Sequence, residues 1–333
     1  MAPAPRRVAH LIGRSAGGIR RHVRYLAQHP PDGYETLGVW GPAHLEDYFD
    51  DVPFYRAAPL DRIRGPKRAQ VIHAHGLTAG GVALQPMHEP VVITVHTDIT
   101  TQGRTAHSRA LRALAQRIAA GADAVIAVSD VVARAFPGAR VIAPPTEKLP
   151  PPTRTSYDTR EALGTPQDRP VVIAVARLHP DKGLDLFIDA LRGTDAEGWI
   201  CGDGPLRADL EARAEGTNVR LLGQRDDVAN LLAAADVFAL PSVGEAYGIA
   251  VQEALSSGLP VVTSDAGAMP ELIGDAGIVV GAGDRTAFVD AVHRAIANEA
   301  LRADLVQRAR ARTFEDPMAL VAKIGAVYDE VDA

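Results

Sequence analysis

Short apolar runs alternate with amphipathic stretches along most of the chain, and this alternation is the feature that most constrains the fold. In the first half, strands are expected at residues 8–14, 34–40, 69–76, 91–98 and 123–129, with helices at 17–29 and 108–122. Near-continuous apolar strands separated by helices are typical of a parallel sheet covered on both faces.

The alternation stops at residues 143–152, APPTEKLPPP, which read as a proline-stiffened linker, and then starts again. Further strands are expected within residues 170–178, 198–205, 219–223, 237–242 and 260–265, with helices at 184–191, 205–214 and 228–235. The sequence therefore predicts an α/β protein with two Rossmann-like, doubly wound parallel-sheet domains, residues 1–150 and 151–316. An amphipathic helix within residues 317–333 is expected to pack on the body of the protein, and a return to the first domain is one arrangement open to it.

Length and composition are those expected of a soluble globular protein of two domains. The chain has 333 residues, of which 47% are hydrophobic and 23% charged, and 333 residues exceed the size at which one core keeps growing. Apolar runs are shorter than the ~20 residues that span a bilayer, and the first residues do not resemble a signal peptide. A single cysteine, Cys201, excludes an internal disulfide. We therefore expect a cytoplasmic protein.

Charge is unevenly distributed between the halves. Residues 1–150 contain 18 Lys and Arg against 12 Asp and Glu, whereas the rest contains 17 against 29. A basic cluster on or beside the first predicted helix fits either a solvated helix face or attraction to an anionic acceptor or membrane surface. This cluster comprises Arg14, Arg20, Arg21, His22 and Arg24. A peripheral position at the inner membrane face is compatible with it, and no nucleic-acid partner is expected.

Polar residues follow the predicted strands of the first half. Two doubly wound domains predict a cleft, because ligands bind such sheets at the carboxyl ends of the strands. Gly17 and Gly18 open the first helix, where free N–H groups can approach a ligand, although the spacing is not that of a dinucleotide fingerprint. His96 follows a strand and is expected to enter the cleft. His73 and His75 share a strand face, but no third metal ligand is obvious, so core or loop histidines are the favoured interpretation.

Two cations of the second half occupy similar positions. Arg177 follows a strand and Lys182 precedes a helix, which favours a role in neutralising a diphosphate, most strongly as charge builds up on departure. Gly204 lies in a second strand-to-helix turn, GDGP, and is a predicted donor-binding residue, as is Arg225.

Two carboxylates, Glu245 and Glu253, stand eight residues apart in a stretch almost free of other charges. Gly244 and Gly248 indicate that Glu245 lies on a loop and Glu253 inside the following helix, whose start attracts anions. A fully helical segment would separate the two carboxylates by ~12 Å, which suits two ends of one extended ligand. Two solvated surface charges are the alternative.

Together these motifs resemble those of the family 4 glycosyltransferases, retaining enzymes of the GT-B fold, over nearly the whole chain. The eight-residue glutamate pair followed by GLPVV is the most specific part. The resemblance implies that Arg177 and Lys182 bind the donor diphosphate and Glu253 the ribose hydroxyls. Glu245 would contact the transferred sugar, with the neighbouring backbone of Tyr247, Gly248 and Ile249. His96 would contact the sugar from the other domain, and Gly17 would lie near the phosphate and acceptor.

The implied reaction moves a hexose from a nucleotide-diphosphate sugar to an acceptor hydroxyl with retention, by front-face substitution. A covalent mechanism would need carboxyl groups ~5 Å apart, and the two cations make a metal cofactor unnecessary. A GT-B nucleotide-sugar epimerase and a non-catalytic nucleotide-sugar binder are the alternatives. The acceptor stays open among lipid, glycan, peptide and small metabolite.

Residues 223–227 bear on the identity of the donor base, because they resemble the base-binding loop of phosphatidylinositol mannosyltransferases. Asp227, beside Arg225, would face guanine in that family, since a carboxylate matches the adjacent N1–H and N2–H₂ donors. Acidic residues here also serve as helix N-caps. GDP-mannose and a UDP-sugar therefore both remain candidates.

Overall fold

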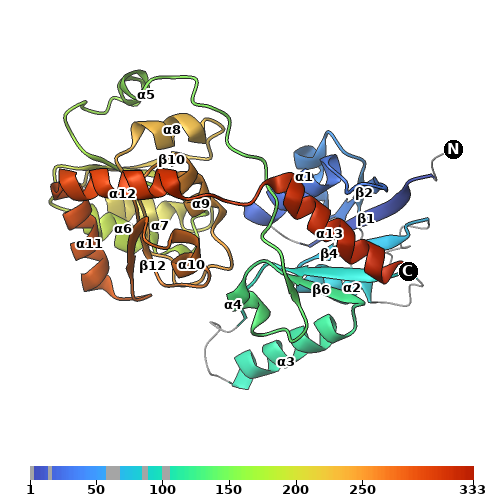
Figure 1. Cartoon of the computed structure of the whole chain (residues 1–333). Coiled ribbons are helices and arrows are strands. Elements are labelled where there is room, and N and C mark those ends of the chain that lie inside the picture. The colour runs from blue at the N-terminus through green and yellow to red at the C-terminus, as the bar shows by residue number, and fades with distance from the viewer. Residues whose placement is uncertain (1–3, 14–16, 58–67, 85–88, 100–105) are drawn as a thin grey trace. The chain divides into compact units, whose positions relative to one another are not determined.

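The computed structural model describes residues 4–13, 17–57, 68–84, 89–99 and 106–333. Arg14 of the basic cluster lies outside these residues. The chain divides into two compact units, the first made of Met1–Glu147 together with Glu315–Ala333, the second of Lys148–Phe314 (Figure 1). The polypeptide therefore passes from one unit to the other twice.

The first unit is built on a parallel sheet of seven strands. Their order is β3-β2-β1-β4-β5-β6-β7. The strand order reverses between β1 and β4, each of which is the first strand of one half of the sheet. The strands are β1 (Arg6–Ile12), β2 (Tyr34–Gly41), β3 (Phe54–Arg56), β4 (Val71–His75), β5 (Val91–Val95), β6 (Ala124–Ala127) and β7 (Arg140–Val141). β4 and β5 are buried at every position, as their near-continuous apolar sequences indicate.

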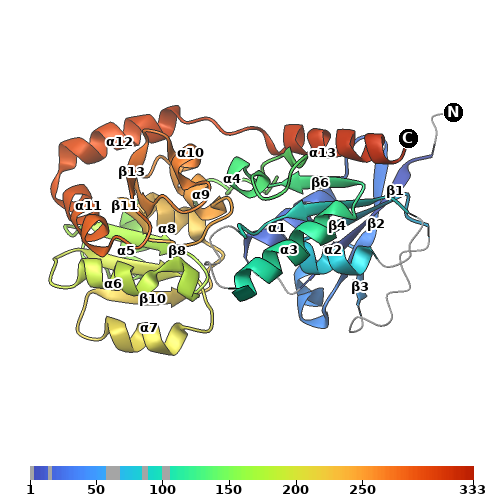
Figure 2. The same cartoon turned by 90° about the horizontal axis from the view of Figure 1, so that it is seen from below.

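Helices cover both faces of this sheet. They are α1 (Gly18–Gln28), η1 (Ala43–Phe49), α2 (Leu77–Ala83), α3 (Ala106–Ala120), α4 (Asp130–Ala133) and α13 (Pro317–Val331). Figure 2 shows α13 on one face and α2 and α3 on the other. α13 starts where the Asp316 carboxylate accepts from the Met318 N–H, with Pro317 in the first turn. It buries Leu320, Ile324, Val327 and Tyr328 at helical spacing against the apolar residues of β1, β4 and β5.

The second unit repeats the architecture with six parallel strands in the order β10-β9-β8-β11-β12-β13. Numbered within the unit, this order is 3-2-1-4-5-6, that of a doubly wound dinucleotide-binding sheet. The strands are β8 (Val171–Val175), β9 (Glu197–Cys201), β10 (Val219–Gly223), β11 (Val237–Leu240), β12 (Val261–Ser264) and β13 (Gly277–Val280). The expectation of two doubly wound parallel sheets is confirmed.

The remaining helices surround the second sheet and enclose a continuous apolar core that includes Trp199, Phe187 and Phe238. They are α5 (Ser156–Ala162), η2 (Pro180–Lys182), α6 (Leu184–Leu191), α7 (Arg207–Ala214), α8 (Val228–Ala234), α9 (Ile249–Ser256), α10 (Met269–Ile273), α11 (Arg285–Ala297) and α12 (Glu299–Ala311). None of the helices in the described part of either unit is long and apolar enough to cross a membrane.

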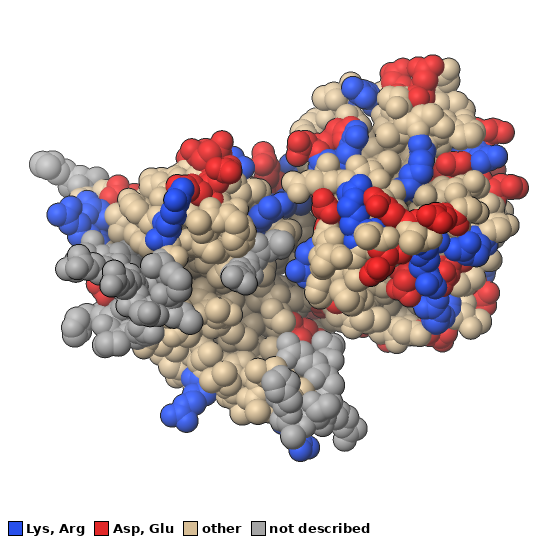
Figure 3. Space-filling model, turned by 180° about the vertical axis from the view of Figure 1, so that it is seen from behind, with Lys and Arg blue, Asp and Glu red and all other residues tan. Residues whose placement is uncertain are grey.

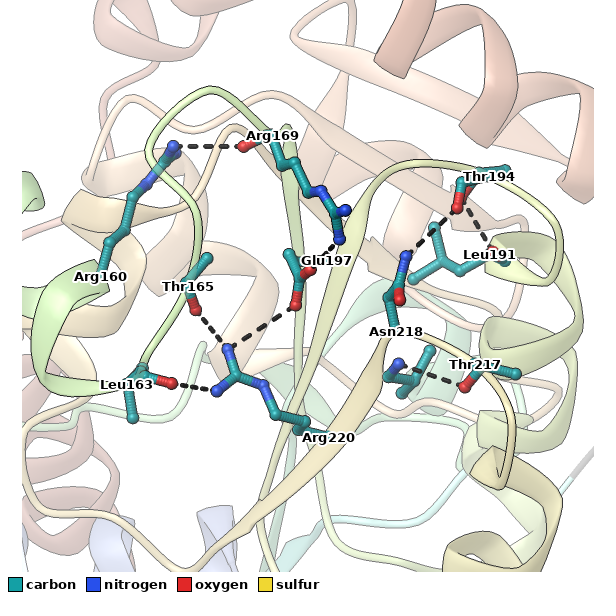
Figure 4. A network of polar contacts seen from close by, with 11 residues as sticks. Arg160, Leu163, Thr165, Arg169, Leu191, Thr194, Glu197, Thr217, Asn218 and Arg220 are labelled. Atoms are coloured by element: carbon teal, nitrogen blue, oxygen red, sulfur yellow. Dashed lines mark hydrogen bonds and ion pairs between the residues drawn. The ribbon is translucent and has the colours of Figure 1, made fainter.

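A polar network fixes the outer strands of the second sheet (Figure 4). The buried Glu197 of β9 accepts a hydrogen bond from Arg169 at 2.9 Å and lies 3.8 Å from the Arg220 guanidinium of β10. Arg220 also donates to the Leu163 carbonyl and the Thr165 hydroxyl. The network ties the segment before β8 to β9 and β10, at the sheet edge remote from the switch point between β8 and β11.

Acidic and basic side chains lie interspersed on the face of the second unit visible in Figure 3. The second unit also has ion pairs between helices, such as Arg213 with Asp189 at 2.6 Å and Arg285 with Asp185 at 3.3 Å. The negative excess of this half is therefore not gathered into one acidic patch on that face.

Candidate active site

The loops after β8 and β11 carry the predicted cations and the first glutamate. β8 and β11 are neighbours in the sheet, although β9 and β10 lie between them in the sequence. Residues 63 positions apart, Lys182 and Glu245, consequently meet: the Lys182 Nζ donates to Glu245 Oε2 at 2.6 Å. The crevice beyond a switch point is where doubly wound sheets bind their ligands.

Lys182 and Glu245 form a nearly buried ion pair, with side chains 14% and 17% exposed. Asp181 continues the charge cluster, because its carboxylate lies 3.8 Å from the Lys182 Nζ and 3.7 Å from the Arg177 guanidinium. The His179 ring nitrogen Nδ1 is 2.6 Å from the same carboxylate. Arg177 is the most exposed member at 42%. The cluster presents one exposed and one sheltered cation at the end of β8, an arrangement suited to a polyanionic ligand.

Glu245 lies on the loop and Glu253 inside α9, as the sequence predicts. Gly248 precedes the helix with a φ of 100° and no side chain caps the first turn, so the N–H groups at its start are not occupied by a capping side chain. Tyr247, Ile249 and Glu253 are each half-buried around this start. The helix N-terminus and Glu245 therefore belong to one loop-helix segment beyond β11.

Gly267 packs directly against the Glu245 backbone, a contact that sequence reasoning missed. A Cβ at Gly267 would lie 1.4 Å from the Glu245 carbonyl oxygen, and its φ of 57° disfavours other residues. We expect Gly267→Ala to displace the Glu245 loop and lower kcat/KM for glycosyl transfer by ~10-fold or more, since small misplacements of a binding group are costly. Steady-state kinetics measures this.

Gly281→Ala is the matched control for this substitution, because a Cβ there would meet only the Asp284 Cβ at 3.8 Å. It should leave the kinetics unchanged. Equal kinetics for both variants would show that the Glu245 loop does not need the glycine.

Three further predicted donor-binding residues lie near the ends of β9 and β10, namely Gly204, Arg225 and Asp227. Gly204 approaches the Leu178 backbone so closely that a Cβ would lie 2.5 Å from its carbonyl oxygen, which joins the GDGP turn to the loop after β8. After β10, Arg225 binds Asp227 through two hydrogen bonds of 2.7 Å. The hydrogen bonds from Arg225 hold the pKa of Asp227 below its usual value. Asp227 does not cap α8 with its side chain.

In the first unit, Gly17 is the N-cap of α1 with a φ of 67°, and Gly18 is the first helical residue. His96 follows β5 directly and is half-buried. Burial lowers the pKa of His96 well below the ordinary value, and a neighbouring imidazole, His22, lowers it further. His96 is therefore neutral at neutral pH.

His96 is one of five neighbouring histidines, with His10, His22, His73 and His75 as the others. Burial lowers the pKa of His10 to about 3 and that of His22 to about 4. Sequence reasoning recognised only the pair His73 and His75. Their neighbours in the structure are His10 from β1, His22 from α1 and His96 from the end of β5.

Much of the basic cluster on α1 has partners within the first unit. Arg24 donates to Asp51 at 2.7 Å, and the Arg20 guanidinium lies over the Tyr48 ring, 4.5 Å from its centroid. These contacts fix α1 against η1 and the segment after it, so the two arginines have a structural role.

Comparison with known proteins agrees with this geometry. Residues 5–152 match the family model of the glycosyl transferase 4-like domain, and residues 169–298 match that of the glycosyl transferases group 1. A phosphatidyl-myo-inositol mannosyltransferase of Mycobacterium leprae is 31% identical over 361 residues, which cover 95% of this chain and 93% of the relative. The chain belongs to the group 1 glycosyltransferases.

Further relatives of this glycosyltransferase extend the agreement. The phosphatidyl-myo-inositol mannosyltransferase of Mycolicibacterium smegmatis is 29% identical, over 95% of this chain and 90% of the relative. Among solved structures, Anabaena HepE in complex with UDP-glucose superposes with a TM-score of 0.83 at 22% identity, covering 97% of this chain and 99% of that one. This glycosyltransferase therefore has the GT-B fold.

The structure brings together part of the predicted site of the glycosyltransferase. Within the second unit, it joins Lys182 to Glu245, places Arg177 beside them through Asp181, and pairs Arg225 with Asp227. The individual roles of these residues, and those of Gly17, Gly18 and His96 in the first unit, stay predictions. Asp181 and His179 are the residues of this cluster that sequence reasoning missed, although their position between two assigned cations was a usable signal.

Proposed function

We propose that this glycosyltransferase moves a hexose from a nucleotide-diphosphate sugar, GDP-mannose, to an acceptor hydroxyl with retention of anomeric configuration. The observation that carries the proposal is the Lys182–Glu245 pair at the switch point of the second sheet, with Arg177 close by. A cation held by a carboxylate at this point can bind a diphosphate while the carboxylate receives the attached sugar.

The proposed chemistry is front-face substitution. The bond from the anomeric carbon to the diphosphate oxygen breaks, and its electron pair leaves on that oxygen. The acceptor oxygen then bonds to the same face of the anomeric carbon, and its proton passes to the departing phosphate oxygen. Arg177 and Lys182 stabilise the growing negative charge, which is a transition-state interaction and therefore raises kcat. Because these two side chains supply the positive charge, the transfer needs no metal cofactor.

A screen of nucleotide sugars tests this function directly. Purified protein with GDP-mannose, and with UDP-linked and other GDP-linked sugars, should release the nucleotide from GDP-mannose fastest, and no more slowly with EDTA present than without it. Proton NMR of the first product formed should show the anomeric configuration of the donor. An inverted product, a freely epimerised donor, or no turnover with any donor would refute the proposal.

Guanine recognition is assigned to Asp227. Its carboxylate is held in one orientation by the two hydrogen bonds from Arg225, while each oxygen keeps a further lone pair for an N–H donor. Ionisation is secured because Arg225 lowers the Asp227 pKa. A relative whose name states that it is GDP-mannose-dependent, 38% identical over 37% of this chain, supports a GDP-linked donor. The UDP-bound HepE is related to this chain only through its fold.

Titration with free nucleotides is expected to show GDP binding at least ~10-fold more tightly than UDP, since one lost charge-assisted hydrogen bond costs 1.5–3 kcal/mol. Asp227→Ala should abolish that preference, because it should weaken GDP binding and leave UDP binding unchanged. Asp226→Ala, an exposed neighbour, is the control. Equal affinities of the unaltered protein for both nucleotides would contradict the assignment to guanine.

The acceptor is proposed to be presented at a membrane surface, where the enzyme would work as a peripheral protein of the cytoplasmic face. The lipid acceptor that the name of the Mycobacterium leprae relative implies supports this, as does the excess of Lys and Arg in residues 1–150. Arg20 and Arg24 contribute less to attraction toward a membrane surface than free arginines would, because they are engaged with Tyr48 and Asp51.

A further inference from the structure

The five-histidine cluster of the first unit lies at the switch point of its sheet. β1 and β4 are the neighbouring strands there, and His10 stands opposite His73 in their register. His75 ends β4, His22 lies on α1, and His96 follows β5. Because the carboxyl ends of parallel strands meet at one edge, these rings come from separate parts of the chain to one place.

In the inner part of the cluster, His73 has both ring nitrogens hydrogen-bonded, whereas His10 Nε2 has no partner among the described residues. His73 is joined through Nδ1 to the Tyr328 hydroxyl and through Nε2 to the Thr94 hydroxyl, both at 2.6 Å. His10 and His75 are joined to each other, Nδ1 to Nε2, at 3.1 Å. His73 is therefore a core histidine, with neither ring nitrogen left for a ligand.

The outer part is different. His22 Nε2, His75 Nδ1 and His96 Nε2 are buried and have no hydrogen-bond partner among the described residues. One ring nitrogen of each of these three residues lies within 4.8 Å of one from each of the others. The ring centroid of His22 is 5.2 Å from that of His75 and 5.0 Å from that of His96. Buried polar atoms without partners are rare and point to a bound species that completes them.

The far sides of two of these rings are held in the manner of metal ligands. His22 Nδ1 lies 3.2 Å from the Pro145 carbonyl oxygen, which only an N–H can satisfy, so Nε2 keeps its lone pair. His75 Nε2 is joined to His10 Nδ1, and in the tautomer whose Nε2–H donates to His10, His75 Nδ1 keeps the second lone pair. Ligating histidines usually donate their other N–H to a carbonyl or a similar acceptor, which fixes ring and tautomer.

We propose that His22, His75 and His96 bind a zinc ion, with a fourth position left for water or a small anion. Three imidazoles with one open position are a known zinc coordination, with Zn–N distances of about 2.0–2.1 Å. Those distances place the ligand nitrogens about 3.3 Å apart in a tetrahedron, so small ring rotations from the observed spacing complete the site. It lies wholly within the first unit and does not depend on the proposed glycosyl transfer. Because His96 is also expected to contact the donor sugar, zinc would compete with the donor, and binding rather than turnover is the readout to use.

Zinc titration of the full chain tests the proposal. The protein is produced without a polyhistidine tag, stripped with EDTA, dialysed, and titrated with Zn²⁺ against a chromophoric chelator. One equivalent should bind tightly enough to compete with the chelator and should raise the thermal unfolding midpoint. Co²⁺ in place of Zn²⁺ should give the intense visible absorption of a tetrahedral site.

His96→Gln and His22→Gln should each weaken zinc binding by at least ~10-fold, a loss that even second-shell changes can reach. His96 is the safer substitution for folding, since it is half-buried beyond the end of a strand. His44→Gln, an exposed histidine on η1, is the matched control and should bind zinc normally. Unchanged affinity in both cluster variants, or no tight site in the unaltered protein, would overturn the proposal; in the latter case the three nitrogens bind no more than an ordered water.

Discussion

Replacement of Lys182 by alanine is expected to lower kcat/KM by at least ~100-fold. The Lys182 Nζ lies 2.6 Å from Glu245 Oε2 in a pair that is largely shielded from water, where electrostatic interactions are strong. Its charge is proposed to stabilise the diphosphate most when that group leaves, so kcat should fall more than KM rises. Arg177→Ala should cause a loss of the same order. Initial rates of nucleotide release over a range of GDP-mannose concentrations measure both.

Arg285→Ala is the control, because Arg285 pairs with Asp185 and Asp189 on the surface of the second unit, with its side chain 53% exposed. Its kinetics should stay within about twofold of the unaltered enzyme. Near-normal turnover of the Lys182 or Arg177 variant would contradict the assignment of that cation. A Glu245→Gln background separates a second explanation: if Lys182 served only to hold Glu245, its removal there would cost nothing further.

Acid is expected to unfold the first unit before the second. The buried imidazoles have folded pKa values below the unfolded value of about 6.5, with His10 at about 3 and His22 at about 4. Below pH 6.5 these imidazoles are therefore protonated in the unfolded state but stay neutral in the folded state. The free energy of unfolding consequently falls as pH falls. Each group contributes about 1.4 kcal/mol per pH unit, so these two remove about 5 kcal/mol by pH 4.5, an appreciable share of the 5–15 kcal/mol of a typical domain.

The remaining members of the cluster act in the same direction. Burial and the surrounding imidazoles also lower the pKa of His73, His75 and His96, and Tyr328 of α13 faces them as a neutral phenol. In the second unit, arginines hold the pKa of Asp189 and Asp227 below the ordinary 3.8. Their contribution is present above that value and is lost only as pH falls through and below it.

The two tryptophans allow the two transitions to be seen separately. Trp40 lies on β2 of the first unit and Trp199 on β9 of the second, so Trp40→Phe and Trp199→Phe each leave one reporter. In EDTA, fluorescence should report loss of the first unit between pH 6 and pH 4, ahead of the second. His10→Gln should make the pH dependence of first-unit stability shallower by one proton, whereas His44→Gln should not. Coincident transitions would disprove the expectation.

Sequence reasoning located the strands and the ends of the strands, because runs such as VVIAV and VVITV are apolar throughout and polar residues follow them directly. It did not predict which of those ends meet. Lys182 and Glu245 pair because β11 inserts beside β8 rather than beside β10, and strand order is not visible in a single sequence. Short elements without clear periodicity, such as β3 and α2, were missed for a related reason: they are defined by neighbours already in place.

The histidines show the same limit more sharply. His73 and His75 were visible as a pair on one strand face, but their partners His10 and His22 are more than 50 positions earlier in the sequence. Adjacency of β1 and β4 brings His10 opposite His73. Metal motifs whose ligands are close in sequence can be recognised from their spacing. A site assembled from strands on both sides of a switch point has no characteristic spacing in the sequence.

The return of the last helix to the first unit has a consequence for the order in which the protein forms during synthesis. The second unit is one uninterrupted stretch, Lys148–Phe314, and has all its parts as soon as that stretch has left the ribosome. The first unit, although translated earlier, lacks the apolar side of α13 and the Tyr328 hydroxyl that bonds His73 until residues 315–333 emerge. Its exposed sheet face must wait through the translation of the whole second unit. The half that is made first is therefore completed last, and its intermediate is the one most in need of protection from aggregation.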